Sequence, residues 1–260
     1  MNSGIEILAR AGYAARGVVY LIIGFFAVLA ALGPSDVRGT EGALAAILSQ
    51  PFGRVLLWIV GLGLVAFCLW RIVQAVRDTD NHGKTAKGLA IRAGLVGGGL
   101  SYAAAALVAL GIAQGTGGGA SGSDPTGAWI ASIHEAGLGW LLVYGVAALF
   151  AVVGLAHLVK GIRAGFEKYF RCSNGVMNWL RPLSRFGLIA RGVVFLILAG
   201  LIVSGGLAYN AEDRPGLADA LQAVQGGAFG WIILLAIALG LMAFGAYSLA
   251  EARYRHVSPH

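Results

Sequence analysis

Charged residues are scarce in this chain of 260 residues: Asp, Glu, Lys and Arg make up 12% of it, whereas soluble domains carry about a quarter. This scarcity excludes an ordinary soluble domain, because a water-exposed surface needs charge. Apolar residues instead account for 58% of the chain, and the mean hydropathy is +0.77. Lipid is therefore the expected solvent of most of the chain.

Cysteine and proline are also rare, at two and six residues. The isolated thiols of Cys68 and Cys172 do not make a metal site, and no disulfide is expected between a membrane span and a basic loop. We expect no metal and no cofactor. All six prolines are expected at helix ends, in loops or in the tail, so that no proline breaks a helix: Pro34, Pro51, Pro125, Pro182, Pro215 and Pro259.

Long uncharged stretches predict six membrane-spanning helices. Four of them, 93–123, 136–159, 192–211 and 220–250, reach or exceed the roughly 20 residues that a spanning helix needs. Two shorter ones become long enough when they are extended through a flanking arginine, whose stem reaches the headgroups: 17–32 through Arg16 and 55–70 through Arg71. No Asp or Glu falls in any of these spans, which argues against ion coupling through buried carboxylates and hence against an active pump.

A cleaved signal peptide is the alternative for the first span, because arginines precede its apolar run. The same pattern recurs around Arg185, deep inside the chain, so we expect the first span to be retained. The predicted fold is all-α, with no soluble domain.

Lys and Arg are distributed unevenly among the loops. Residues 71–92 hold five positive and two negative charges, and residues 160–191 hold seven and one. The segments 32–51, 113–136 and 206–228 are instead net negative. Since short cytoplasmic loops collect Lys and Arg, both termini are expected in the cytoplasm, with the protein in the cytoplasmic membrane. This sorting also argues against nucleic acid as a partner, because the positive charge does not gather on one soluble face.

A two-helix unit occurs three times. The segments 10–20, 92–102 and 185–195 align without gaps, each opening with Arg-x-Gly, and 63–67 (Gly-Leu-Val-Ala-Phe) parallels 240–244 (Gly-Leu-Met-Ala-Phe). The units are 1–80, 81–170 and 171–260. Since each has an even number of spans, they are parallel repeats. A pseudo-threefold bundle is the simplest arrangement, and a linear packing of three hairpins is the alternative.

Each unit also holds a short external segment between its two spans: 41–51, 126–134 and 216–225. Apolar residues recur there at helical spacing, for example Leu44, Ile47 and Leu48. We expect three interfacial helices, each with one apolar and one wet side.

The sequence resembles a bacterial membrane family known as domain of unknown function 1206, whose members are triple repeats of helix pairs. The residues that carry the resemblance are the Arg-x-Gly-x-x-x-Arg-Gly-x-x-Tyr start at 10–20, its near copy at 185–195, and Gln-Pro-Phe-Gly-Arg at 50–54. The resemblance covers almost the whole chain and implies architecture and a bacterial origin, but no activity. The middle repeat departs from the pattern, with Gly98 where the other two repeats have arginine.

The repeated start places a stripe on one face of each odd-numbered helix, because its residues are four apart. The stripe consists of Arg16 and Tyr20, Gly98 and Tyr102, and Arg191 and Phe195. If these faces meet, the two arginines converge near the cytoplasmic mouth while the glycine leaves a gap. Such a pocket suits an anionic headgroup or a small anion. A structural interpretation stays open, in which the arginines snorkel and the aromatic rings stack on them.

Other ionisable residues have simpler expectations. The outer arginines Arg10, Arg92 and Arg185 fit interface anchors. His157 is the one potentially titrating side chain far inside an even-numbered helix. It is interpreted either as a neutral histidine that is hydrogen-bonded at the interface or as a proton-coupling group.

Nothing in the sequence supplies a nucleophile with a positioned base, so an enzyme is not expected. The predicted function is a binding or passive transport module for a lipid, an apolar molecule or a small anion. The alternative is a structural scaffold that binds partner chains. The expected partners are membrane lipids, and a partner membrane protein or a second copy of the chain is possible.

Overall fold

The computed structural model describes residues 3–33, 40–115, 139–205, 217–226 and 229–256, and this part of the chain is helical apart from short turns and one isolated bridge. Its long helices are α1 (Ser3–Leu32), α3 (Gly53–Arg77), α4 (Ala86–Gln114), α6 (Gly139–Ile162), α7 (Asn174–Gly205) and α9 (Gly230–Tyr254). Its short helices are α2 (Thr40–Leu48), the 3-10 turn η1 (Glu167–Tyr169) and α8 (Leu217–Gln225).

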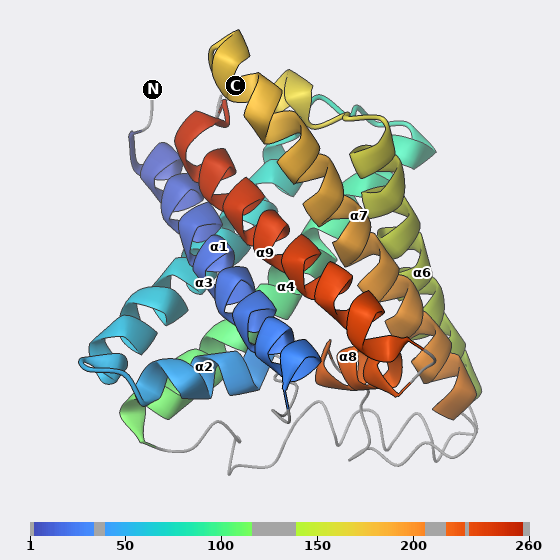
Figure 1. Cartoon of the computed structure of the whole chain (residues 1–260). Helices are drawn as coiled ribbons and strands as arrows, with labels where there is room; N and C mark the ends of the chain where they lie inside the picture. The colour runs from blue at the N-terminus through green and yellow to red at the C-terminus, as the bar shows by residue number, and fades with distance from the viewer. Residues whose placement is uncertain (1–2, 34–39, 116–138, 206–216, 227–228, 257–260) are drawn as a thin grey trace.

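All six long helices are long and apolar enough to cross a membrane, which confirms the predicted fold class. They pack in the spatial order α4, α3, α1, α9, α7, α6. In Figure 1, α1 and α9 lie in the middle, with α3 and α4 on one side and α6 and α7 on the other. Over their described lengths, α4 and α6 do not pack along each other. The series is therefore open between its two end helices, and the pseudo-threefold arrangement stays a prediction.

The start of α1, the end of α9 and both basic loops gather at one end of the bundle (Figure 1). The Arg10 side chain on α1 donates to the Ala252 carbonyl of α9 at 2.6 Å. The loop after α6 reaches the same place, because the Arg171 N–H donates to the Tyr254 carbonyl at 2.9 Å. The start of α1 and the end of α9 therefore lie at the same end of the bundle, as an even number of membrane crossings requires.

Glycines set the closest helix approaches within the first and third units. A Cβ on Gly12 of α1 would lie 2.6 Å from the Phe67 backbone of α3, and one on Gly187 of α7 would clash with the Phe244 backbone of α9. Real Cβ atoms do not approach this closely, so only glycine lets the backbones meet. Equivalent positions of the two units therefore make the same helix contact.

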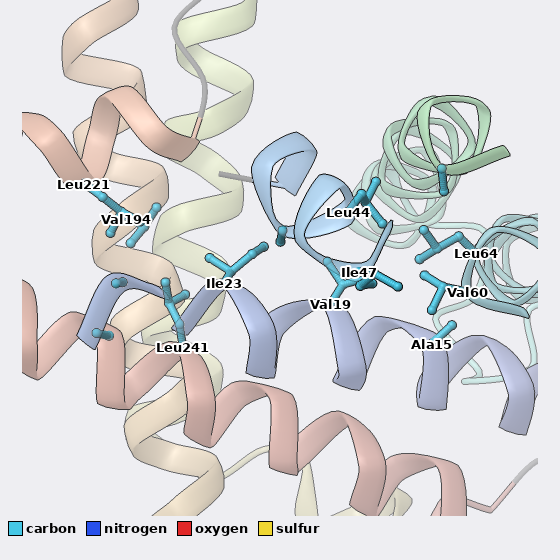
Figure 2. Packing of buried hydrophobic residues seen from close by; sticks show 14 of the residues in the cluster. Ala15, Val19, Ile23, Leu44, Ile47, Val60, Leu64, Val194, Leu221 and Leu241 are labelled. Carbon is cyan, nitrogen blue, oxygen red and sulfur yellow. The ribbon is translucent and has the colours of Figure 1, made fainter. Parts of the chain in front are cut away.

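The short helices α2 and α8 cover the opposite end of the bundle, and the helical part of the interfacial-helix prediction is confirmed for both. Their apolar sides face the bundle: Leu44 and Leu221 are fully buried and Ile47 is 6% exposed. Figure 2 shows Leu44 and Ile47 against the α1 and α3 side chains, with Leu221 beside Val194. The apolar side is thus used for packing within the protein. The third predicted helix, 126–134, lies outside the described residues.

One proline prediction is wrong. Pro182 lies inside α7, which begins at Asn174 and so extends well before the apolar stretch. The helix starts there because the Ser173 hydroxyl accepts from the Val176 N–H at 3.5 Å and the Ser173 carbonyl from the Met177 N–H. Pro51 lies in the turn before α3. The others lie outside the described residues: Pro34, Pro125, Pro215 and Pro259.

Candidate functional site

Arg16 lies about midway along α1 and is 3% exposed. Its Nε donates to Ser248 Oγ at 3.0 Å, and its Nη2 donates to the carboxylate of Glu251 on α9. Three rings lie over the guanidinium, with centroids 5.1, 4.8 and 5.0 Å from Cζ: Tyr13, Phe67 and Phe244. This buried cation therefore has both a counter-ion and an aromatic enclosure.

The Arg16 pair belongs to a larger buried network. Glu251 also accepts from Arg255 Nη1 at 2.7 Å. Arg255 Nη2 in turn donates to the two carboxylate oxygens of Asp80, in the loop after α3, at 3.1 and 3.0 Å. Gln74 Nε2 donates to the same carboxylate at 3.1 Å. Arg71 Nη1 donates to Gln74 Oε1 at 3.1 Å. Three arginines and two carboxylates therefore take part in a network that joins α1, α9, the end of α3 and the loop after it.

The prediction that no carboxylate lies in a span is wrong for Glu251, which is 3% exposed in α9. The uncharged stretch 220–250 ends one residue before Glu251. The sequence pattern therefore assigns Glu251 to the polar segment that follows the span. The repeat contained the signal: Glu251 follows Tyr247 by four residues, as Gln74 follows Trp70. All four of these side chains are buried.

Arg191 lies about midway along α7 and is 8% exposed. Its Nη2 donates to the Tyr102 hydroxyl of α4 at 2.9 Å. Its Nε and Nη1 are buried and have no hydrogen-bond partner in the described structure. Three rings lie over the guanidinium, with centroids 4.6, 5.0 and 4.4 Å from Cζ: Tyr20, Phe195 and Phe244. Among the described side chains, no carboxylate pairs with this cation.

The outer arginines are not plain interface anchors, because each donates to carbonyls in the last turn of a neighbouring helix. Those carbonyls lack partners within their own helix. A cation at the C-terminal end of a helix also interacts favourably with the negative end of the helix dipole. The acceptors are Ala252 and Arg253 for Arg10, Ala75 and Val76 for Arg92, and Gly161 and Ile162 for Arg185. The same contact therefore occurs three times, each time between two units.

This repeated contact shows which residue of α6 corresponds to Glu251. On α9, Glu251 directly precedes Ala252, the first carbonyl bound by an outer arginine. On α6, Lys160 directly precedes the equivalent Gly161. A lysine therefore stands where the partner of Arg191 would be expected. Arg16 of the first unit is therefore paired with Glu251, whereas Arg191 of the third unit has no carboxylate partner among the described residues.

The predicted stripe is brought together only in part. Arg16 and Arg191 both lie over the Phe244 ring, but their hydrogen bonds go to different partners. The common basic pocket near the cytoplasmic mouth stays a prediction. Tyr102 joins Arg191 directly, and Tyr20 and Phe195 flank it. Gly98 contacts neither arginine, and a Cβ there would meet no heavy atom within 4 Å.

His157 lies beside the Arg191 site, on α6. Its Nδ1 donates to the Val153 carbonyl at 2.8 Å, and its ring packs edge-on against Phe195 at 5.5 Å and lies 6.4 Å from Phe244. A donating Nδ1 leaves Nε2 as the second polar atom of the ring. Both interpretations of this residue, neutral histidine and proton-coupling group, stay predictions.

The fold and these contacts define the class: a multi-pass integral membrane protein with buried arginines, of which Arg16 has a carboxylate partner and Arg191 has none among the described residues. The chain belongs to the family described as Domain of Unknown Function (DUF1206), whose model matches residues 11–78 and 186–255. These segments are most of the first and third units, whereas the middle unit, which carries Gly98, lies outside the match.

A similar protein is "Uncharacterized protein YxxB" of Bacillus subtilis (strain 168). It is 30% identical over 257 residues, covering 98% of this chain and 92% of the relative. No solved structure matches the chain. The resemblance noted from the sequence motifs is thereby confirmed.

Proposed function

We propose that this protein binds an anion within the membrane, with Arg191 as the principal ligand. The observation that carries the proposal is a buried guanidinium whose Nε and Nη1 have no partner, while the equivalent Arg16 is paired with Glu251. A guanidinium matches carboxylate and phosphate groups. The ligand is therefore expected to carry one of these groups.

Electrostatics support a ligand at Arg191 more than a purely structural role. Removing a cation from water costs several kcal/mol unless an anion and hydrogen bonds compensate it. The three rings around Arg191 attract its charge, but they accept none of the N–H bonds on Nε and Nη1. A bound carboxylate or phosphate would supply both the charge and the acceptors.

The scaffold alternative is less well supported, because most glycine faces that could dock another chain are already used inside the bundle. Gly17 and Gly24 of α1 lie against α9, and Gly63 of α3 lies against α1. Gly192 of α7 lies against α6 in the same way. These close contacts hold the protein's own helices together.

Thermal unfolding of the delipidated protein in a neutral detergent tests the proposal, with sodium phosphate and sodium acetate as probes at constant ionic strength. A ligand that binds only the folded state stabilises it by RT ln(1 + [L]/Kd), so the stabilisation rises with ligand concentration. The wild type and an Arg163→Met control, which removes an exposed arginine, should gain the same stabilisation. Arg191→Met should gain none. Equal stabilisation of Arg191→Met and the wild type would refute the site.

We also propose that the protein resides in the cytoplasmic membrane with both termini inside. The basic loops lie at the end of the bundle that holds the start of α1 and the end of α9, and such loops are retained in the cytoplasm. Reporter fusions after residue 256 and within 116–138 would test this. A reporter that is active outside the cell at the C-terminus would overturn the orientation.

A further inference from the structure

Resting on the proposed anion site, we infer that its ligand is an anionic lipid that enters sideways between α4 and α6. Its phosphate or carboxylate head binds Arg191, and its acyl chain lies along the Gly98 face of α4. This inference deepens the proposed function, since an anion site alone does not require an apolar tail.

The first step concerns the opening in the bundle. The helices form an open series that ends at α4 and α6, and the described parts of these two helices do not pack along each other. Each is only 17% buried over its most apolar window, whereas the other four helices are 44–56% buried. The side of the bundle between α4 and α6 is therefore the one that neighbouring lipid can enter.

The second step places Arg191 at this opening. Arg191 comes from α7, which packs on α6, and its Nη2 reaches Tyr102 on α4. This hydrogen bond joins α7, on which the end helix α6 packs, to α4, the other end helix of the series. The Arg191 guanidinium therefore lies between the α7 and α4 sides of the bundle.

The third step concerns Gly98, one helical turn before Tyr102 and so on the same face of α4. Gly98 is half-buried, yet a Cβ there would meet nothing within 4 Å. The adjacent Gly97 is exposed, and Gly99, in contrast, would contact Arg71 of α3 at 3.0 Å. Space without protein atoms therefore adjoins Tyr102, on the side of α4 that turns toward the bundle.

The fourth step concerns the apolar surroundings of the cation. Phe195 lies against Arg191, and it packs edge-on against both Phe150 and His157 of α6, at 5.7 and 5.5 Å. A fully hydrated anion would lose its water against such walls, whereas an acyl chain that is already in lipid packs against them without any cost of desolvation. The combination of one unpaired cation with apolar walls and a lateral opening favours an amphipathic ligand.

The experiment is native mass spectrometry of the protein in neutral detergent, titrated separately with phosphatidylglycerol, phosphatidylcholine and glycerol phosphate, a headgroup without chains. Gly98→Leu adds bulk to the open face, where a Cβ would meet no heavy atom within 4 Å. Gly97→Leu is its matched control, because it adds the same bulk one residue away on the exposed side. Arg191→Met removes the cation. Circular dichroism and thermal unfolding confirm that each variant is folded.

We expect phosphatidylglycerol to bind the wild type at least about tenfold more tightly than either other probe. Gly98→Leu should weaken phosphatidylglycerol binding about tenfold and leave glycerol phosphate binding unchanged. Gly97→Leu should match the wild type, and Arg191→Met should lose the preference for the anionic lipid.

Three outcomes would overturn the inference. If glycerol phosphate binds as tightly as the lipid and Gly98→Leu has no effect, the ligand is a free anion and the proposed function stands. If Arg191→Met binds every probe like the wild type, the proposed function fails as well. If the native protein is a dimer that Gly98→Leu dissociates, the face is covered by a second copy instead of a lipid.

Discussion

The buried arginines Arg16 and Arg191 should respond differently to the same substitution, because only Arg16 has a carboxylate partner among the described residues. Arg16→Met breaks the ion pair with Glu251 and the hydrogen bond to Ser248. Breaking a buried pair typically costs 3–5 kcal/mol. Arg255 still compensates Glu251, so we expect a loss near the lower end, about 3 kcal/mol.

Arg191→Met removes one hydrogen bond, to Tyr102, which contributes about 1 kcal/mol. It also removes the ring contacts of the cation, and it relieves the cost of burying a charge without a counter-ion. These terms oppose one another, so the delipidated variant should unfold within about 1 kcal/mol of the wild type.

The assay is equilibrium unfolding by SDS in mixed micelles, followed by circular dichroism, on delipidated protein. A second titration with phosphatidylglycerol present should stabilise the wild type and Arg16→Met equally and leave Arg191→Met unchanged. The reasoning is refuted if the two substitutions cost the same in delipidated protein, because Arg191 would then have a partner equivalent to Glu251.

Two further predictions concern the fold. Gly12→Ala should destabilise the protein by about 1–3 kcal/mol in the same unfolding assay, because its Cβ would meet the Phe67 backbone. Gly94→Ala is the control: its Cβ would meet nothing within 4 Å, so it should not destabilise the protein. An equal loss in both would show that the contact does not limit packing. Arg185→Ala should leave the end of α6 without its side-chain donor and so raise hydrogen exchange there, with little change at the end of α3. Uniform exchange in both helices would contradict that role.

The six spans followed from the sequence because lipid imposes one strong rule: a spanning segment must be predominantly apolar over about 20 residues. Prediction failed where that rule does not apply. Helix α7 extends well before its apolar stretch, through Pro182, since a capping serine and not hydropathy determines its start. The sides of α2 and α8 that looked suited to lipid instead pack onto the bundle.

The sequence predicted the arginines of the candidate site but not the residues that pair with them. The four-residue spacing identified Arg16 and Arg191 and the aromatic residue that follows each. It did not identify Glu251, because an acid one residue beyond an apolar stretch looks like a polar flank until α9 is placed against α1. The hydrogen bond between Arg191 and Tyr102 likewise joins two units, and spacing within one unit carries no information about it.

By itself, the sequence determined that this is a multi-pass membrane protein, and it predicted repeated helix pairs with an arginine in two of three aligned positions. Only the tertiary structure decided that these arginines differ. Charge neutralisation depends on which side chain the neighbouring helix presents within a few ångströms, and that neighbour belongs to another unit. Glu251 supplies it for Arg16, whereas α6 has Lys160 at the position that corresponds to Glu251. The unpaired cation, and with it the proposed lipid site, results from that packing.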